Sequence, residues 1–155
     1  MDDIRQALKQ TKLFGSREEA VYLGLQLVAE GLRARFNDLF KTRDLTGAQY
    51  NVLRILRGAG EDGLPCREIG ERMITRDSDI TRMLDRLEAR ALIRRERQSD
   101  DRRVVLTVIT KRGLEVLSEL DEPVSDLHIE QLGHLSEKEL QTLSRLLSKV
   151  RKAAK

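Results

Sequence analysis

Tryptophan is absent from this chain, and its 155 residues include only three phenylalanines and two tyrosines. Proteins that bind single-stranded nucleic acid stack bases on aromatic side chains, so this scarcity argues against such a platform. A single cysteine cannot form an internal disulfide, which favours a reducing cytoplasm. No apolar run approaches the roughly 20 residues that span a bilayer, and the charged start MDDIRQALKQ lacks the apolar segment of a secretory signal. These absences predict a cytoplasmic protein with no membrane partner.

Signatures of catalysis and of metal binding are also missing. The sequence contains no GxSxG, Walker or GxGxxG pattern. Its carboxylates alternate with Arg and Lys at i,i+3 and i,i+4 spacings, which is typical of solvated helical faces. The two histidines, His128 and His134, stand six residues apart with no second cysteine to complete a zinc site. We therefore expect no enzymatic activity, no cofactor and no metal.

Helical patterns fill most of the chain. Capping boxes at Ser16–Glu19, Thr46–Gln49 and Ser136–Glu139 predict three helix starts. Shorter helices are expected at 50–56, 66–73 and 78–90, and Pro123 is expected to kink or interrupt a long helix that starts near Gly113. The β-branched segment 104–109 reads as a strand, with 93–97 as its antiparallel partner. The predicted fold is mainly α with a small β-hairpin, an α+β chain.

The helices at both ends carry more apolar surface than a small central module can cover. The first has a stripe from Val21 to Phe40, and the last has one from Leu140 to Val150. Pairing between two subunits would bury both stripes around a two-fold axis, whereas packing within one chain is the alternative. We expect one compact domain overall, with a leader and dimerisation helix at 1–42, a central module at 45–113, and C-terminal dimerisation helices at 114–155.

Arginine is concentrated in the segment 72–103. This segment holds ten arginines, no lysine and seven acids, so its net charge of +3 equals that of the whole chain. The planar guanidinium suits phosphates and guanine edges better than the ammonium of lysine. The order helix, turn, capped helix at 66–90 indicates a helix-turn-helix, whose second helix (about 78–90) enters the major groove of double-stranded DNA. The hairpin at about 93–109 would then be a wing that reaches a neighbouring minor groove.

Specific residues follow from this arrangement. The candidate DNA-binding residues lie in the turn before the second helix, on that helix and at the hairpin tip: Arg76, Ser78, Asp79, Thr81, Arg82, Arg86, Asp101, Arg102 and Arg103. Other roles remain open for several of them. Arg82 could instead pair with Asp79 or Asp85, Arg86 could be structural, and Ser78 could simply cap the helix.

The central segment resembles the MarR family of bacterial winged helix-turn-helix transcription regulators. The resemblance rests on DITRMLDRLE at 79–88, ALIRR at 91–95, DDRRVVLT at 100–107 and ITKRG at 109–113. It implies a homodimer with interlocked first and last helices that binds a pseudo-palindromic operator, with half-sites about 10 bp apart. It further implies that Arg103 enters the minor groove while Asp101 orients the base of the wing. Ala91 stands where the family often has glycine, so we expect a turn there that is tighter or less left-handed.

The resemblance also implies a ligand-responsive repressor. A small aromatic acid or phenol would bind between the dimer helices and the winged module, with Tyr22, Phe36, Phe40 and His134 as candidate ligand-binding residues. Two alternatives remain open at this point. One is a helical homodimeric module that binds another protein and not DNA. The other is a thiol-based redox-sensing regulator that uses Cys66, although a lone cysteine is more often a packed residue.

Overall fold

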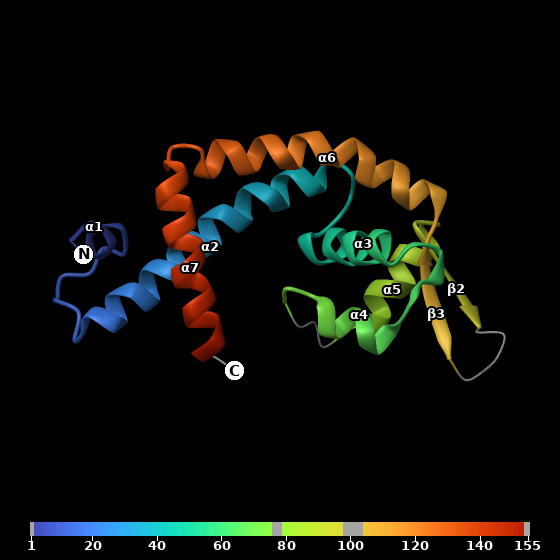
Figure 1. Ribbon diagram of the computed structural model, residues 1–155, viewed down its shortest axis with the longest axis horizontal. Coiled ribbons are helices and arrows are strands. Elements are labelled where there is room, and N and C mark those ends of the chain that lie inside the picture. The colour runs from blue at the N-terminus through green and yellow to red at the C-terminus, as the bar shows by residue number, and fades with distance from the viewer. Residues whose placement is uncertain (1, 76–78, 98–103, 154–155) are drawn as a thin grey trace. The chain divides into compact units, whose positions relative to one another are not determined.

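Figure 1 shows the chain as a computed structural model, in which residues 2–75, 79–97 and 104–153 are described. The described elements, in chain order, are α1 (Asp2–Ala7), α2 (Arg17–Lys41), α3 (Gly47–Ala59), the 3-10 helix η1 (Gly60–Asp62), β1 (Leu64–Pro65), α4 (Cys66–Arg72), α5 (Ile80–Ala89), β2 (Ile93–Arg97), β3 (Val105–Ile109), α6 (Lys111–Leu132) and α7 (Glu137–Ala153). The expected class, mainly helical with a small antiparallel sheet, is confirmed. The chain divides into two compact units, Met1–Leu120 and Asp121–Lys155, and the division falls within α6.

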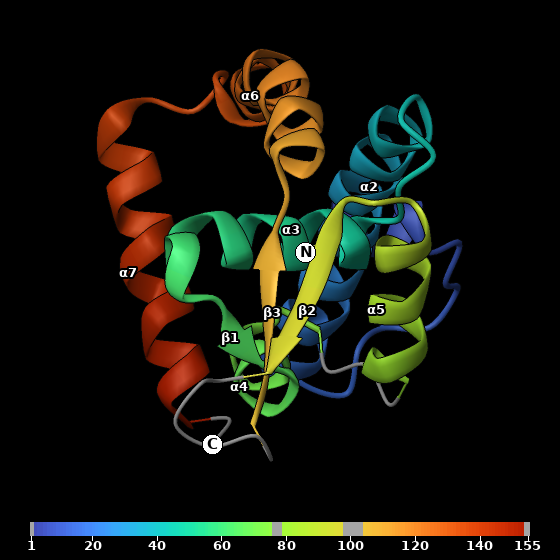
Figure 2. The same cartoon turned by 90° about the vertical axis from the view of Figure 1, so that its right-hand side faces the viewer.

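The sheet of the first unit has three antiparallel strands in the order β1-β3-β2 (Figure 2). The hairpin β2–β3 matches the sequence prediction, with Ile93 opposite Ile109 and Arg97 opposite Val105. The two-residue strand β1, directly before the helix expected at 66–73, was not predicted. It forms because Gly63, at φ 61°, lets the chain approach β3 so closely that a Cβ there would lie 2.7 Å from the carbonyl oxygen of Thr107.

A single apolar core lies between this sheet and the helices of the first unit. Its fully buried side chains come from α3, α4, α5, the start of β2 and α6: Val52, Leu53, Leu56, Ile69, Leu84, Leu87, Leu92, Ile93, Leu117 and Leu120. The capping box at the start of α3 is complete, because the hydroxyl of Thr46 accepts from the Gln49 N–H and the Gln49 side chain accepts from the Thr46 N–H. Burial on α5 from Met83 to Leu87 fixes which face of that helix points outward.

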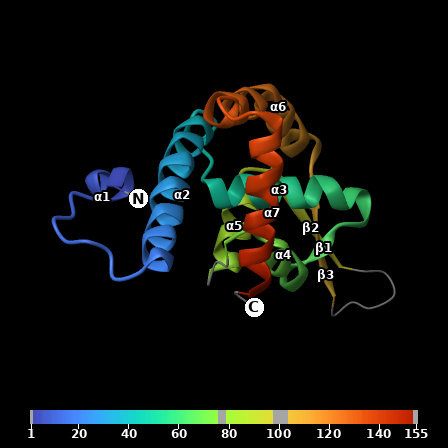
Figure 3. The same cartoon turned by 60° about the vertical axis from the view of Figure 1, so that its left-hand side comes forward.

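The N-terminal segment forms a short helix that the sequence did not predict. α1 lies beside α2 in Figure 3, and Ile4 reaches to within 2.7 Å of the position that a Cβ on Gly24 would occupy. Ala20, one turn earlier on α2, is completely buried. The six residues of α1 are too few to show a helical period. Ala20 and Gly24 alone do not indicate in the sequence that another helix packs against them.

Pro123 does not interrupt α6, contrary to one form of the prediction. The helix continues through Pro123 to Leu132. A proline removes one backbone hydrogen bond, but Leu120 and Val124 are buried on either side of it and hold the flanking turns. The helix ends at Leu132, and the N–H of the next residue, Gly133, donates to the carbonyl of Ile129 at 2.7 Å.

The second unit carries α7, and no described residue of this helix is buried. Its apolar positions Leu140, Leu143, Leu147 and Val150 are 36 to 51% exposed. The N-terminal half of α2 is similar, with Val21 and Val28 more than half exposed. The apolar stripe of α7 and the N-terminal half of the α2 stripe thus remain uncovered, whereas Phe40, at the end of the α2 stripe, is buried.

Candidate nucleic-acid interface

The helices α4 and α5 form the helix-turn-helix of the first unit. Gly70 on α4 lies close to Ile80, whose Cδ1 would be in ordinary van der Waals contact, at 3.5 Å, with a Cβ at position 70. Met73 is buried at the end of α4, and the next residue is fixed by α3, because the side-chain oxygen of Asn51 accepts a 3.0 Å hydrogen bond from the Ile74 N–H. Ile74, just after the end of α4, is therefore tied to α3.

α5 presents one apolar and one polar face. Met83, Leu84 and Leu87 are buried against the core. The opposite face exposes Thr81, Arg82, Asp85 and Arg86. The helix begins at Ile80 with Asp79 at its N-cap position, two residues later than the expected start at 78. The polar face is the surface that this module can offer to a DNA groove.

Arg82 and Arg86 differ in their surroundings. A nitrogen of Arg82 lies 3.4 Å from a carboxylate oxygen of Asp79, yet its side chain stays 76% exposed. The ion pair weighed from the sequence therefore exists, and an exposed pair of this kind is weak enough for a phosphate to replace. Arg86 is exposed and has no ion pair with any residue in the described ranges. A single turn of α5 thus carries two cations on its outer face.

Other arginines of the segment 72–103 serve the scaffold. Arg95 on β2 donates to Asp85 at 2.7 Å and lies 3.4 Å from Glu88, both on α5. The Glu88 carboxylate also accepts from the Arg95 backbone N–H at 3.1 Å. Arg94 pairs with Glu96 on its own strand. β2 is therefore fastened to α5, and the arginine excess divides into a structural and an exposed part.

Five of the candidate DNA-binding residues lie outside the described residues: Arg76, Ser78, Asp101, Arg102 and Arg103. The alternative role of Ser78 as a helix cap therefore also falls outside the described residues. Asp79, Thr81, Arg82 and Arg86 are described, and they lie together at the start and on the outer face of α5.

The turn between α5 and β2 corrects one prediction. Ala91 adopts a left-handed conformation with φ 57°, although alanine in place of glycine had suggested a less left-handed turn. Its carbonyl accepts a 2.7 Å hydrogen bond from the hydroxyl of Thr110, and the Leu92 carbonyl accepts from the Thr110 N–H at 3.1 Å. Two tertiary hydrogen bonds hold the turn in a geometry that the alanine Cβ alone disfavours.

A cavity of about 380 Å³ lies between the C-terminal half of α2, the start of α3 and the end of α4. It is lined by Arg33, Phe36, Asn37, Phe40, Thr46, Gly47, Ala48, Asn51, Met73, Ile74 and Thr75. Two of the four candidate ligand residues, Phe36 and Phe40, thus lie together, with ring centroids 5.9 Å apart. Tyr22 and His134 do not line it. Arg33 was missed because one arginine on a charged helix carries no distinguishing pattern.

The described part of the chain contains neither a cluster of metal-binding side chains nor a helix that could cross a membrane. Within residues 2–75, 79–97 and 104–153, no three His, Cys, Asp or Glu side chains lie close enough to hold a metal ion. None of the described helices combines the length and apolarity needed to cross a bilayer. Cys66 is a free, half-buried thiol at the first residue of α4.

Comparisons with known proteins agree with this geometry. Residues 45–105 match the model of the MarR family. The chain is 30% identical over 134 residues to the HTH-type transcriptional repressor MdtR of Bacillus subtilis, covering 86% of this chain and 85% of MdtR. A structure of a mutant MarR from Escherichia coli complexed with operator DNA superposes with a TM-score of 0.73 at 30% identity, covering 81% of this chain and 89% of that one. A putative MarR-like regulator from Bacillus cereus shares the fold, with a TM-score of 0.81 at 24% identity over 91% of this chain and all of that one.

Proposed function

This chain belongs to the MarR family of DNA-binding transcriptional regulators, and from that premise we propose that it acts as a homodimeric repressor of a pseudo-palindromic operator. The observation that carries the proposal is the outer face of α5, where Thr81, Arg82 and Arg86 are exposed beside a fully apolar inner face. Phosphate contacts would place the dimer on the duplex, and base edges would be read from the first turns of α5. Arg76, Ser78, Asp79, Asp101, Arg102 and Arg103 complete the proposed contact set.

The DNA experiment uses the full-length protein and a randomised pool of about 30 bp duplexes. Rounds of capture should enrich one pseudo-palindromic sequence, whose affinity for the protein falls steeply with salt because bound counterions are released. Arg82→Ala and Arg103→Ala should each weaken binding at least tenfold. A protein-interaction module without DNA binding predicts no enriched sequence, and no effect of either substitution.

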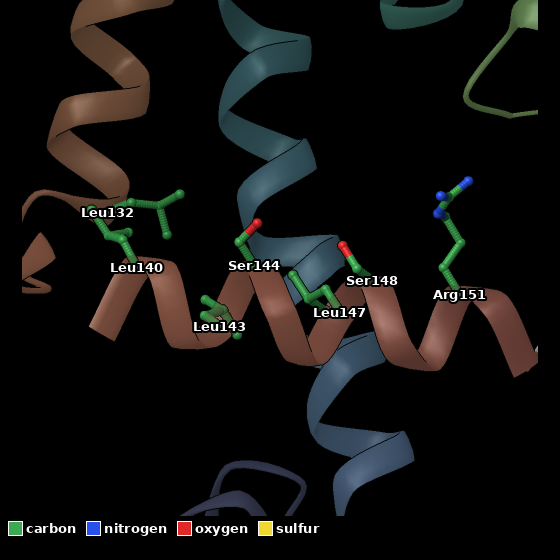
Figure 4. A pocket seen from close by; sticks show the side chains of 7 residues that line it. All are labelled: Leu132, Leu140, Leu143, Ser144, Leu147, Ser148 and Arg151. Atoms are coloured by element: carbon green, nitrogen blue, oxygen red, sulfur yellow. The ribbon is translucent and has the colours of Figure 1, made fainter. Parts of the chain in front are cut away.

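Dimer formation is proposed from the exposed apolar faces of α7 and α2. Leu132, Leu140, Leu143 and Leu147 line a groove of about 350 Å³ along α7, with Ser144, Ser148 and Arg151 at its polar edge (Figure 4). A second copy of the chain supplies a matching surface by two-fold symmetry. Sedimentation should show a dimer for the wild type, and a shift to monomer for Leu147→Glu. Lys138→Glu, on an exposed position of the same helix, is the matched control and should remain dimeric.

A small aromatic acid or phenol is the proposed effector, and the cavity lined by Phe36 and Phe40 is its proposed site. Two aromatic rings suit an aromatic ligand, and the guanidinium of Arg33 suits a carboxylate. Calorimetry with benzoate and with phenol tests this. Phe36→Leu should abolish binding, while Tyr22→Leu, outside the cavity, should leave it unchanged. Equal ligand affinity of the two variants would show that the ligand does not bind in this cavity.

The remaining parts of the proposal are a cytoplasmic location and the absence of enzymatic activity. The absence of enzymatic activity is supported by the regulators that the chain resembles. The cytoplasmic location is supported by the single cysteine, which cannot form an internal disulfide. A redox mechanism at Cys66 is the weaker alternative. Operator affinity is measured before and after peroxide for the wild type and for Cys66→Ser. The same response of both proteins to peroxide would exclude this alternative.

A further inference from the structure

Arg90 joins the end of α5 to a loop far from it in sequence. It is the residue that follows α5, and its side chain is half-buried. Its Nη1 donates to the carbonyl oxygen of Asp44 at 2.5 Å, and its Nη2 donates to the carbonyl oxygen of Arg43 at 2.8 Å. Both terminal nitrogens of the guanidinium are therefore occupied by backbone atoms of the α2–α3 loop.

That loop has a shape that suits a cation. The N–H groups of Arg43 and Asp44 bond back to the carbonyls of Phe40 and Lys41, both at 3.0 Å. Asp44 then takes a left-handed conformation with φ 52°, and the chain turns into α3. The two carbonyls left over, those of Arg43 and Asp44, accept from Arg90. Charged donors strengthen such hydrogen bonds, and the C-terminal end of α2 favours a positive charge.

The same loop is held from α6. The Nε of Arg43 donates to a carboxylate oxygen of Glu119 at 2.7 Å. Glu119 and Arg43 are about half exposed, so this ion pair alone is weak. Together, however, the contacts form a continuous path from α5 through Arg90 and the loop to α6. Through these contacts, Arg90 couples the position of α5 to the positions of α2 and α6.

We propose that Arg90 is a positioning residue, which fixes the angle at which α5 is presented to DNA without touching DNA itself. The proposal rests on the proposed function, in which the outer face of α5 reads the operator. Arg90 lies at the C-terminal end of α5, whereas the first turns of a recognition helix enter the groove. A helix that pivots at a loosened end keeps its phosphate partners but loses the alignment that base contacts require.

The test compares Arg90→Gln, Arg90→Lys and the control Arg54→Gln, in which an exposed arginine on α3 is lost. Each full-length variant is titrated by fluorescence anisotropy against the enriched duplex and against a random duplex, at several salt concentrations. Thermal unfolding at equal protein concentration verifies folding. Arg90→Gln should bind the enriched duplex about tenfold more weakly or worse, with unchanged affinity for random DNA and an unchanged salt slope. Arg90→Lys should fall between, since an ammonium can still donate to both carbonyls but not as a planar fork.

Each other outcome overturns the proposal. A salt slope shallower by about one for Arg90→Gln would make Arg90 a phosphate contact. Wild-type affinity for the enriched duplex, with a lower unfolding temperature alone, would leave Arg90 a stabilising residue only. If the wild type enriches no duplex, the proposed operator function fails and this proposal falls with it, a result separable from failure of the Arg90 variants alone.

Discussion

The hydroxyl of Thr110 donates a 2.7 Å hydrogen bond to the carbonyl oxygen of Ala91, nineteen residues earlier in the chain. The same oxygen of Thr110 accepts a 3.1 Å hydrogen bond from the N–H of Gly113, in the first turn of α6. One side chain therefore ties the exit of α5 to the start of α6. This junction explains the threonine of the ITKRG segment.

Ala91→Gly should stabilise the fold. Ala91 has φ 57°, a conformation that is unfavourable for every residue with a Cβ. Relief of this strain should outweigh the added entropy of the unfolded chain and raise the free energy of unfolding by about 0.5–1 kcal/mol. Urea denaturation at equal protein concentration measures it. Ala89→Gly, within α5, is the control and should lower stability by a similar amount. A loss of stability in Ala91→Gly would show that the strain assigned to this turn is absent.

Gly113→Ala should destabilise the same junction. A Cβ at position 113 would lie 2.2 Å from the carbonyl oxygen of Leu92, a backbone atom that cannot move aside alone. We expect a loss of about 1–3 kcal/mol, as for overpacked cores. Gly58→Ala is the matched control, because nothing lies within 4 Å of its Cβ position on α3. The control should gain up to about 1 kcal/mol, and equal effects of the two substitutions would contradict the close approach.

Arg95→Ala should detach β2 from α5 and lower stability. Arg95 joins Asp85 and Glu88, and its side chain is only 27% exposed. Because two acids share one guanidinium, we expect a loss of about 1–2 kcal/mol, more than for a single exposed pair. Arg97→Ala, exposed on the same strand, should change stability by less than about 0.5 kcal/mol. Chemical denaturation of both variants decides the matter.

Arg86→Ala should leave stability unchanged and alter DNA binding. Its side chain is exposed on the outer face of α5. Loss of one phosphate contact should make the plot of log affinity against log salt shallower by about one, for specific and random duplexes alike. Arg54→Ala on α3 should keep the wild-type slope. An unchanged slope for Arg86→Ala would place Arg86 outside the phosphate contacts.

Ser136→Ala should raise the pKa of Glu139. The Ser136 hydroxyl and then the Ser136 backbone N–H donate to this carboxylate and hold its pKa below the ordinary value. A lowered folded-state pKa stabilises the fold above the unfolded pKa, and that contribution is lost as pH falls through the folded pKa. NMR titration of the Glu139 carboxyl should show a partial return toward the ordinary value, since the backbone N–H remains. Ser148→Ala should give the wild-type titration, and a wild-type curve for Ser136→Ala would refute the assignment.

Periodic apolar patterns allowed the helices of this chain to be predicted, and tertiary contacts explain what was missed. The stripes of α2 and α7 and the two faces of α5 follow directly from the spacing of their apolar residues. β1 was missed because two residues have no period, and it depends on Gly63 approaching Thr107 from a distant segment. The intrinsic preference of alanine predicts a less left-handed turn at Ala91, whereas the hydrogen bond from Thr110 helps to hold it left-handed.

For the candidate site, the sequence indicated which arginines are present and their order, but not their partners. Arg82, Arg90 and Arg95 look alike in the sequence. In the fold their partners differ. Arg82 pairs with Asp79 at the start of its own helix, Arg90 donates to the carbonyls of Arg43 and Asp44 in the α2–α3 loop, and Arg95 on β2 pairs with Asp85 on α5. Only folding determines which guanidinium remains exposed.

The two edges of the small sheet direct how copies of this protein can associate. β1 is two residues long and ends in Pro65, which cannot donate a ladder hydrogen bond, and β2 carries Arg94, Glu96 and Arg97. Short, proline-bearing and charged edges resist pairing with strands of another chain. Open-ended aggregation through the edges of the sheet is thus disfavoured. Self-association is instead expected through the exposed apolar helix faces, where a two-fold interface is complete with two copies.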